Sequence, residues 1–152
     1  MQVRLARAGE REAAVARLAE RWGDPVIARS QVFPIDGCEI FIAGDMAGLA
    51  AVSRHDKPIA ELVAINAFTP FQGVGSYLLR AIVGSLDGFD ALRLTTTNDN
   101  LDALRFYQRR GFRLTALRPG AIDAMRLQKP RISLTGRYGI PIRDELDLCL
   151  EL

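Results

Sequence analysis

The sequence predicts an α/β-type domain built on a mixed sheet. Two observations predict this class: strand-like apolar stretches follow one another in the first half of the chain, and strands alternate with amphipathic helices in the second half. Strands that meander and then give way to strand–helix units are typical of a mixed sheet with helices packed against it. The chain has 152 residues without repeats or low-complexity linkers, so we expect one domain over residues 1–152.

The strands are predicted from alternation, from β-rich composition and from turn residues between apolar runs. The segments with these patterns are, in order, residues 2–6, the two halves of 38–53, then 59–68, 91–97, 112–117 and 144–152. Gly44 and Asp45 divide the second of these segments, which is typical of a β-hairpin. Residues 24–37 hold two prolines and little periodicity, so we expect a loop there, with one helical turn as an alternative.

The helices are predicted from apolar residues at helical spacing and from their stop and start signals. These segments are, in order, residues 9–23, 74–86 and 98–110, followed by a short one over 120–128. The first ends at Gly23, and the third has an asparagine cap and ends at Gly111, which suits a left-handed C-terminal residue. Residues 129–142 are interpreted as an irregular loop.

Composition and charge exclude several classes of protein. Lys and Arg number 20 against 18 Asp and Glu, a net charge of +2 that is too balanced to indicate nucleic-acid binding. No apolar run approaches the roughly 18 residues of a membrane span, and the charged N-terminal segment lacks the core of a signal peptide. Cys38 and Cys149 have neither metal nor redox spacing, and the only histidine, His55, is interpreted as an exposed turn residue. We expect a cytoplasmic protein without a metal site.

A pair of glycines opens the helix predicted after residue 73. Gly73 and Gly75 would let the backbone approach a ligand, and the amide groups of residues 72–76 would be the unpaired donors of the first helical turn. Such an end suits a phosphate or pyrophosphate, whereas a tight turn with close packing is the alternative. A phosphate-loop NTPase is excluded because no Lys follows Gly75, and a dinucleotide-binding turn is disfavoured because Leu78 stands at its third glycine position.

A second pattern lies downstream. Asn100, Ala103, Phe106-Tyr107 and Gly111-Phe112 form N-x-x-A-x-x-F-Y-x-x-x-G-F, which, with P-x-x-G-x-G upstream, resembles the GNAT family of acetyl-CoA-dependent N-acetyltransferases. The resemblance implies an α+β fold with a mixed, mostly antiparallel central sheet, flanking helices and splayed central strands. Pro70 stands where the family has Gln or Arg, which predicts weaker cofactor binding at that position and an unchanged amide cradle.

The resemblance also implies how acetyl-CoA, the co-substrate, would be held. The loop residues Gln72, Gly73, Val74, Gly75 and Ser76 would bind the pyrophosphate. The pantetheine arm would pair with the backbone of residues 63–67, where amide groups near Ile65 and Asn66 would polarise the thioester carbonyl. Asn100 would contact the pantetheine arm, and a plain helix cap is the alternative for this residue.

Two residues are expected to carry the chemistry. Tyr107 aligns with the tyrosine that protonates the departing thiolate, with a core aromatic as the alternative. Glu61 would deprotonate the acceptor ammonium; by strand alternation it should share a face with Val63 and Ile65, and a solvated edge residue is the alternative.

The predicted reaction is direct attack of a primary amine on acetyl-CoA. A catalytically idle acyl-CoA-binding sensor or subunit is the alternative. The acceptor, a small-molecule or peptide amine, would bind near residues 24–35 and 129–143. The second range contains Arg131, Arg137, Tyr138 and Arg143, which could recognise a carboxylate or phosphate, and a solvated surface is the alternative for them. A homodimer through the alternating segment 144–152 is an open alternative.

Overall fold

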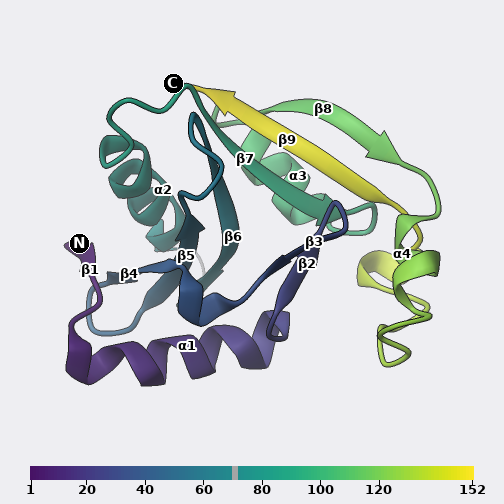
Figure 1. Ribbon diagram of the computed structural model, residues 1–152, viewed down its shortest axis with the longest axis horizontal. Coiled ribbons are helices and arrows are strands. Elements are labelled where there is room, and N and C mark those ends of the chain that lie inside the picture. Colours follow the sequence, from purple (N-terminus) through teal and green to yellow (C-terminus); the bar gives the residue numbers. More distant parts are fainter. Residues whose placement is uncertain (70–71) are drawn as a thin grey trace. The chain divides into compact units, whose positions relative to one another are not determined.

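The computed structural model describes residues 1–69 and 72–152 (Figure 1). The chain forms two compact units, one of residues Met1–Leu92 with Leu152 and the other of residues Arg93–Glu151. In both units strands pair antiparallel and helices pack against strands, so the predicted mixed α/β class is confirmed. None of the helices in the described parts of the chain has the length and apolar character needed to cross a membrane.

The first unit is organised around an antiparallel sheet with the strand order β1-β4-β5-β6. Its strands are β1 (Val3–Leu5), β4 (Glu39–Ala43), β5 (Gly48–Ser53) and β6 (Ile59–Ala67). The turn between β4 and β5 begins at Gly44 with a φ of 57°, a left-handed conformation that glycine adopts without strain. The predicted hairpin is therefore confirmed.

Helices α1 (Ala8–Trp22) and α2 (Val74–Gly84) cover opposite faces of these strands (Figure 1). Leu49 and Ala51 of β5 share a buried cluster with Ala14 and Leu18 of α1. Neighbouring residues of a strand point to opposite faces of the sheet. Gly48, which precedes Leu49, therefore faces α2, where a Cβ on it would meet Val74 and Leu78. The apolar stripe of each helix, read from its spacing, is the side that it buries against the sheet.

Residues 24–37 differ from the predicted loop. They form a small hairpin of β2 (Val26–Ala28) and β3 (Gln31–Phe33), followed by the 3-10 turn η1 (Ile35–Gly37). The two central residues of the hairpin, Arg29 and Ser30, have φ values of 52° and 60°. Such a turn is normally marked by Asn-Gly or a similar pair, so Arg-Ser carried no signal. The helical turn that the sequence left as an alternative is η1.

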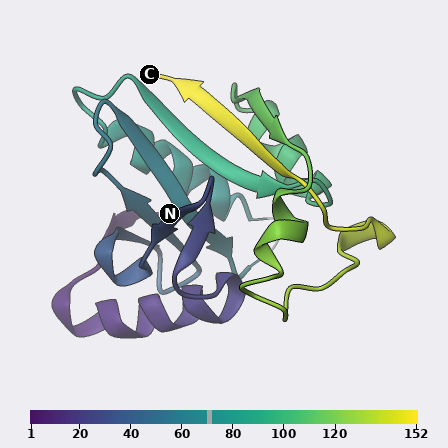
Figure 2. The same ribbon diagram turned by 45° about the vertical axis from the view of Figure 1, so that its right-hand side comes forward.

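The second unit contains strands in the order β7-β9-β8 together with two helices. Its elements are β7 (Ala91–Thr97), α3 (Leu101–Gln108), β8 (Arg113–Arg118), α4 (Ala121–Met125), the 3-10 turn η2 (Arg137–Gly139) and β9 (Glu145–Glu151). Strand β9 lies between β7 and β8, as Figure 2 shows. Both edges of β9 are thus occupied by strands of the same chain. The prediction that residues 144–152 pair with a second copy in a homodimer is therefore wrong.

Candidate functional site

The N-terminal end of α2 presents backbone donors. Gly73, its N-cap residue, has φ 71° and ψ 16°, and its carbonyl accepts the first helical hydrogen bond, from the amide of Tyr77 at 3.1 Å. Because Gly73 has no side chain, it cannot cap the amide groups of Val74 and Gly75, which a helix leaves without intrahelical partners. The helix dipole adds positive potential at this end. The arrangement suits an anion; Pro70 lies outside the described residues.

Gly73 and Gly75 differ in whether their backbone conformation requires glycine. Gly73 adopts a left-handed conformation, which side chains other than glycine rarely tolerate. Gly75 is the second residue of α2 and is helical, so its φ does not require glycine. Any requirement for glycine at this position would come from the absence of a side chain.

Strand β6 contains a β-bulge that changes which side chains share a face. On β5, Ala51 pairs with Ala64 and Val52 with Leu62, so β6 has one extra residue, Val63, at this point. Cross-strand partners have their side chains on the same face of the sheet. Glu61 pairs with Ser53 and Ala64 pairs with Ala51, and Ser53 and Ala51 are two residues apart on β5, so Glu61 and Ala64 share a face. Ile65, the partner of Ala50, lies on the opposite face. The expectation that Glu61 and Ile65 share a face is therefore wrong.

Glu61 is buried and held by an arginine from the β2–β3 hairpin. Its side chain is 6% exposed and that of Arg29 is 14% exposed. Arg29 Nη2 donates to Glu61 Oε1 at 2.6 Å, and Nη1 donates to Oε2 at 3.0 Å. This fork-to-fork geometry is the strongest form of ion pair in proteins. The solvated-edge alternative for Glu61 is thereby excluded, and both carboxylate oxygens have a cationic partner in this structure.

Asn100 is the N-cap of α3, so the helix cap that the sequence left as an alternative is confirmed. Its Oδ1 accepts a hydrogen bond from the amide of Ala103 at 3.4 Å, and its Nδ2 donates to Thr96 Oγ1 at 3.0 Å. The side chain is buried, and its contacts connect the end of β7 to the first turn of α3. The predicted contact of Asn100 with a pantetheine arm remains a proposal.

Tyr107 lies on the buried side of α3 and is 6% exposed. Its ring makes edge-to-face contacts with Phe106 and Phe112, both with centroids 5.2 Å apart. Burial raises the pKa of the Tyr107 phenol above its ordinary value. The hydroxyl therefore stays protonated across the physiological pH range, which is the state that a proton donor requires.

The sequence analysis missed two polar residues before α3. Asn98 Oδ1 accepts hydrogen bonds from the amides of Arg143 at 2.9 Å and Asp144 at 3.0 Å. Asp99 Oδ2 accepts from the amide of Arg137 at 3.0 Å, and a Cβ on Gly136 would overlap this carboxylate. These two residues hold the loop before β9 against the start of α3. The run Asn98-Asp99-Asn100 was a signal, but it was interpreted only as a helix start.

The loop of residues 129–143 has a fixed backbone and an exposed tip. Arg126, the C-cap residue of α4, donates to the carbonyls of Ile132, Ser133 and Ile142, which ties the two sides of the loop together. At the tip, Tyr138 is 68% exposed and its hydroxyl donates to Asp102 at 2.6 Å. This hydrogen bond raises the pKa of Tyr138.

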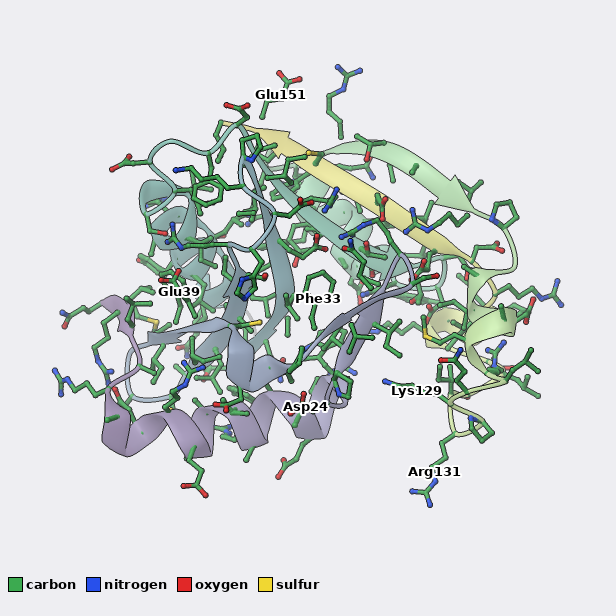
Figure 3. All side chains as sticks on the ribbon, in the orientation of Figure 1. Asp24, Phe33, Glu39, Lys129, Arg131 and Glu151 are labelled. Atoms are coloured by element: carbon green, nitrogen blue, oxygen red, sulfur yellow. The ribbon has the colours of Figure 1, made fainter. Side chains whose placement is uncertain are left out.

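The cations of this loop are at the surface. Arg131, Arg137 and Arg143 are all exposed, and Figure 3 shows the side chain of Arg131 extending away from the ribbon. Arg137 lies 3.5 Å from Asp102 in an exposed ion pair. An ordered loop that displays guanidinium groups can recognise an anionic group on a ligand.

The second unit also contains a buried cluster of acidic residues that the sequence did not reveal. Glu145 and Asp147 of β9 are buried, and both accept hydrogen bonds from Arg118 of β8. Thr95 of β7 donates to Asp147 at 2.7 Å. Alternation over residues 144–152 predicted the strand; in the structure its acidic residues Glu145 and Asp147 are buried, whereas Glu151 is exposed. The cluster connects the three strands of the unit.

Comparison with known proteins gives a consistent result. The family described as "Acetyltransferase (GNAT) family" matches residues 10–112. Protein YdhI of Bacillus subtilis is 32% identical over 135 residues, which cover 84% of each chain, and protein YxbD of the same organism is 31% identical over 139 residues, 88% of this chain and 87% of that one.

Solved structures share the fold. An acetyltransferase of the GNAT family from Elizabethkingia anophelis, with acetyl-CoA bound, superposes with a TM-score of 0.74 at 19% identity, over 99% of this chain and 97% of that one. An IAA acetyltransferase from Bacillus cereus superposes with a TM-score of 0.75 at 23% identity, over 99% and 100% of the two chains.

Proposed function

The chain belongs to the GNAT family of acetyltransferases, and from this membership we infer that it transfers an acetyl group from acetyl-CoA to an amine. The observation that carries the inference is the N-terminal end of α2, where the left-handed N-cap residue Gly73 provides no side-chain cap for the first helical turn. Membership in a family of acetyltransferases also disfavours the idle acyl-CoA-binding alternative. The family match runs from the first compact unit into the second, which supports one acetyltransferase domain over residues 1–152.

We propose that the amide groups of residues 72–76 bind the pyrophosphate of acetyl-CoA. The support is the capless first turn of α2 together with the helix dipole, which favours negative charge. The pantetheine arm would pair with backbone groups of β6 near Ile65 and Asn66.

The proposed reaction is direct transfer without a covalent enzyme intermediate. The neutral amine nitrogen attacks the thioester carbonyl carbon, and amide groups near Ile65 and Asn66 stabilise the negative charge that develops on the carbonyl oxygen. The C–S bond then breaks, and coenzyme A departs as a thiolate. Before the attack, the acceptor ammonium gives one proton to Glu61 through water. Tyr107 donates its phenolic proton to the departing sulfur, and the second proton, which the positively charged nitrogen loses after the attack, returns through water to the Tyr107 phenolate.

The role of Glu61 as base depends on its ion pair with Arg29. Both carboxylate oxygens accept hydrogen bonds from the guanidinium, so a water must use their remaining lone pairs. Arg29 keeps the carboxylate in place through these two hydrogen bonds. We therefore propose Arg29 as the partner that orients Glu61, and Glu61 as the group that receives the proton.

The acceptor is proposed to carry an anionic group near its amine. The exposed Arg131, Arg137 and Arg143 support a carboxylate or phosphate on either a small molecule or a peptide. Cys38 and Cys149 are thiols and not a disulfide, which supports a reducing, cytoplasmic location. A screen of amines with detection of released thiol identifies the acceptor class.

Acetyl-CoA is expected to raise the melting temperature without any added metal. A ligand that binds only the native state stabilises it by RT ln(1 + [L]/Kd), which is about 2.7 kcal/mol at a hundredfold excess over Kd. For a chain of this size the shift should be on the order of 5–10 °C. Differential scanning fluorimetry with millimolar acetyl-CoA measures it, with EDTA present. No shift, together with no heat of binding in calorimetry, would contradict the proposed function.

Gly75→Val is expected to weaken acetyl-CoA binding at least about tenfold, a loss of roughly 1.4 kcal/mol. The branched side chain would project beside the amide donors of α2 and block the approach of the phosphates. Calorimetric titration with acetyl-CoA measures the change. The matched control is Gly84→Val, since Gly84 ends the same helix and has open space around it. Equal affinity of the Gly75 variant and wild type would mean that the loop is only a turn.

A further inference from the structure

Gly48 lies under the first turn of α2. A Cβ built on this residue would overlap Cγ1 of Val74 and would lie 3.0 Å from Cδ1 of Leu78 and 3.3 Å from the backbone oxygen of Asn66. The backbone of Gly48 has no positive φ, so its conformation does not demand glycine. What demands glycine is the close approach of the helix to the strand.

If a side chain were added at position 48, helix α2 would have to move, because the surroundings of Gly48 allow little else. Gly48 is paired on both sides within the sheet, with Ala43 of β4 and Ala67 of β6. Val74 is 1% exposed and β-branched, so its side chain has essentially one rotamer in a helix and cannot turn aside. Leu78, one turn later, is also fully buried. A methyl group at position 48 would therefore push the N-terminal turn of α2 away from the sheet.

We propose that Gly48 is a positioning residue for the phosphate-binding end of α2. Val74 is the first helical residue, and its amide is followed by those of Gly75 and Ser76, so the packing of Val74 on Gly48 sets where all three donors lie. Hydrogen bonds weaken steeply as distance and angle depart from their optimum, so a shift of a few tenths of an ångström lowers affinity for an anion. This inference rests on the proposed binding of coenzyme A at this loop.

The variant Gly48→Ala tests the inference. Its Kd for coenzyme A, measured by calorimetric titration, is expected to rise about 5- to 50-fold. KM for acetyl-CoA should rise in parallel. The matched control is Gly84→Ala, the same chemical change at the open end of the same helix. This control should bind coenzyme A as the wild type does.

A second variant separates positioning from a simple packing defect. The double variant Gly48→Ala/Val74→Ala removes the Cγ1 atom that the new methyl group would meet, so the helix can return toward the sheet. Its Kd should fall back to within about threefold of the wild-type value. Without ligand, amide NMR signals of Gly75 and Ser76 should shift in the single variant and return in the double one.

The outcomes distinguish this inference from the proposed function. If the wild-type protein does not bind coenzyme A, the proposed function is wrong, and the ligand-free NMR shifts still report whether Gly48 sets the helix position. If the wild type binds and Gly48→Ala binds equally well, the inference is wrong. It is also wrong if the single variant unfolds and the double variant folds without regaining affinity, or if both variants unfold, since Gly48 would then be needed only for packing.

Discussion

Tyr107→Phe is expected to lower kcat by a factor on the order of 10²–10⁴, the usual contribution of a positioned general acid. This factor corresponds to roughly 3–5 kcal/mol of transition-state stabilisation. The substitution removes one oxygen and keeps the ring contacts with Phe106 and Phe112, so the variant should fold and bind acetyl-CoA nearly as the wild type does. Steady-state kinetics on the best amine acceptor, with calorimetric binding in parallel, measures both quantities.

The pH dependence of the same variant provides an independent signature. Burial raises the pKa of Tyr107, so the native phenol remains protonated at pH values where the phenol of the unfolded chain, with a pKa near 10, ionises. The stability that this residue contributes is fully present below pH ~10. It is lost at up to about 1.4 kcal/mol per pH unit as the pH rises further, because the unfolded state then binds fewer protons.

Urea unfolding between pH 8 and 11 measures this alkaline loss of stability. In Tyr107→Phe the free energy of unfolding should decrease less at alkaline pH, because the buried phenol is absent. Tyr77→Phe, the same change on an exposed ring, should show the full decrease. The wild-type kcat should also stay constant until the pH exceeds 10. A Tyr107→Phe enzyme that turns over at the wild-type rate would remove this residue from the mechanism and leave a water as the proton source.

Arg29→Met is expected to lower the free energy of unfolding by about 3–5 kcal/mol, the usual cost of removing one partner of a buried ion pair. The cause is that Glu61, which is only 6% exposed at its side chain, loses both hydrogen bonds of the guanidinium fork. Urea denaturation at neutral pH measures the loss. The control is Arg137→Met, which breaks an exposed ion pair with Asp102 and should cost less than about 1 kcal/mol.

Comparison with Glu61→Gln separates the two proposed roles of the glutamate. If Glu61 is the base, Glu61→Gln lowers kcat of the folded enzyme by about 10² or more, and Arg29→Met, which keeps the carboxylate but removes the partner that orients it, lowers kcat less. If Glu61 only anchors the hairpin, both variants lose stability and neither changes kcat in proportion. A double-mutant cycle between the two positions gives the interaction energy of the pair.

Helices and strands whose boundaries are marked by nearby residues of the sequence were predicted well. The strand over residues 91–97 has the predicted ends, and α3 begins after the Asn100 cap and stops before Gly111, whose φ is 95°. The Gly44 hairpin and the glycine-led start of α2 were likewise predicted. In each case a single residue with a conformational preference marks the boundary, so neighbours along the chain suffice.

The features that were missed depend on residues far apart in the sequence. The hairpin of residues 26–33 has strands of three residues and a turn without glycine or asparagine. Its position is set in part by the pairing of Arg29 with Glu61, which is 32 residues away along the chain. The bulge at Val63 reverses the side-chain alternation of β6 and can be seen only against its partner β5.

The sequence by itself determined the family, the order of most elements and the residues expected to do the chemistry, because these follow from short motifs and local periodicity. Only the tertiary structure decided that Glu61 is buried against Arg29, that β9 is an inner strand, and that Gly48 packs closely against Val74 at the start of α2. The physical reason is that burial, strand neighbours and close approach are properties of pairs of segments. No window of sequence contains both members of such a pair.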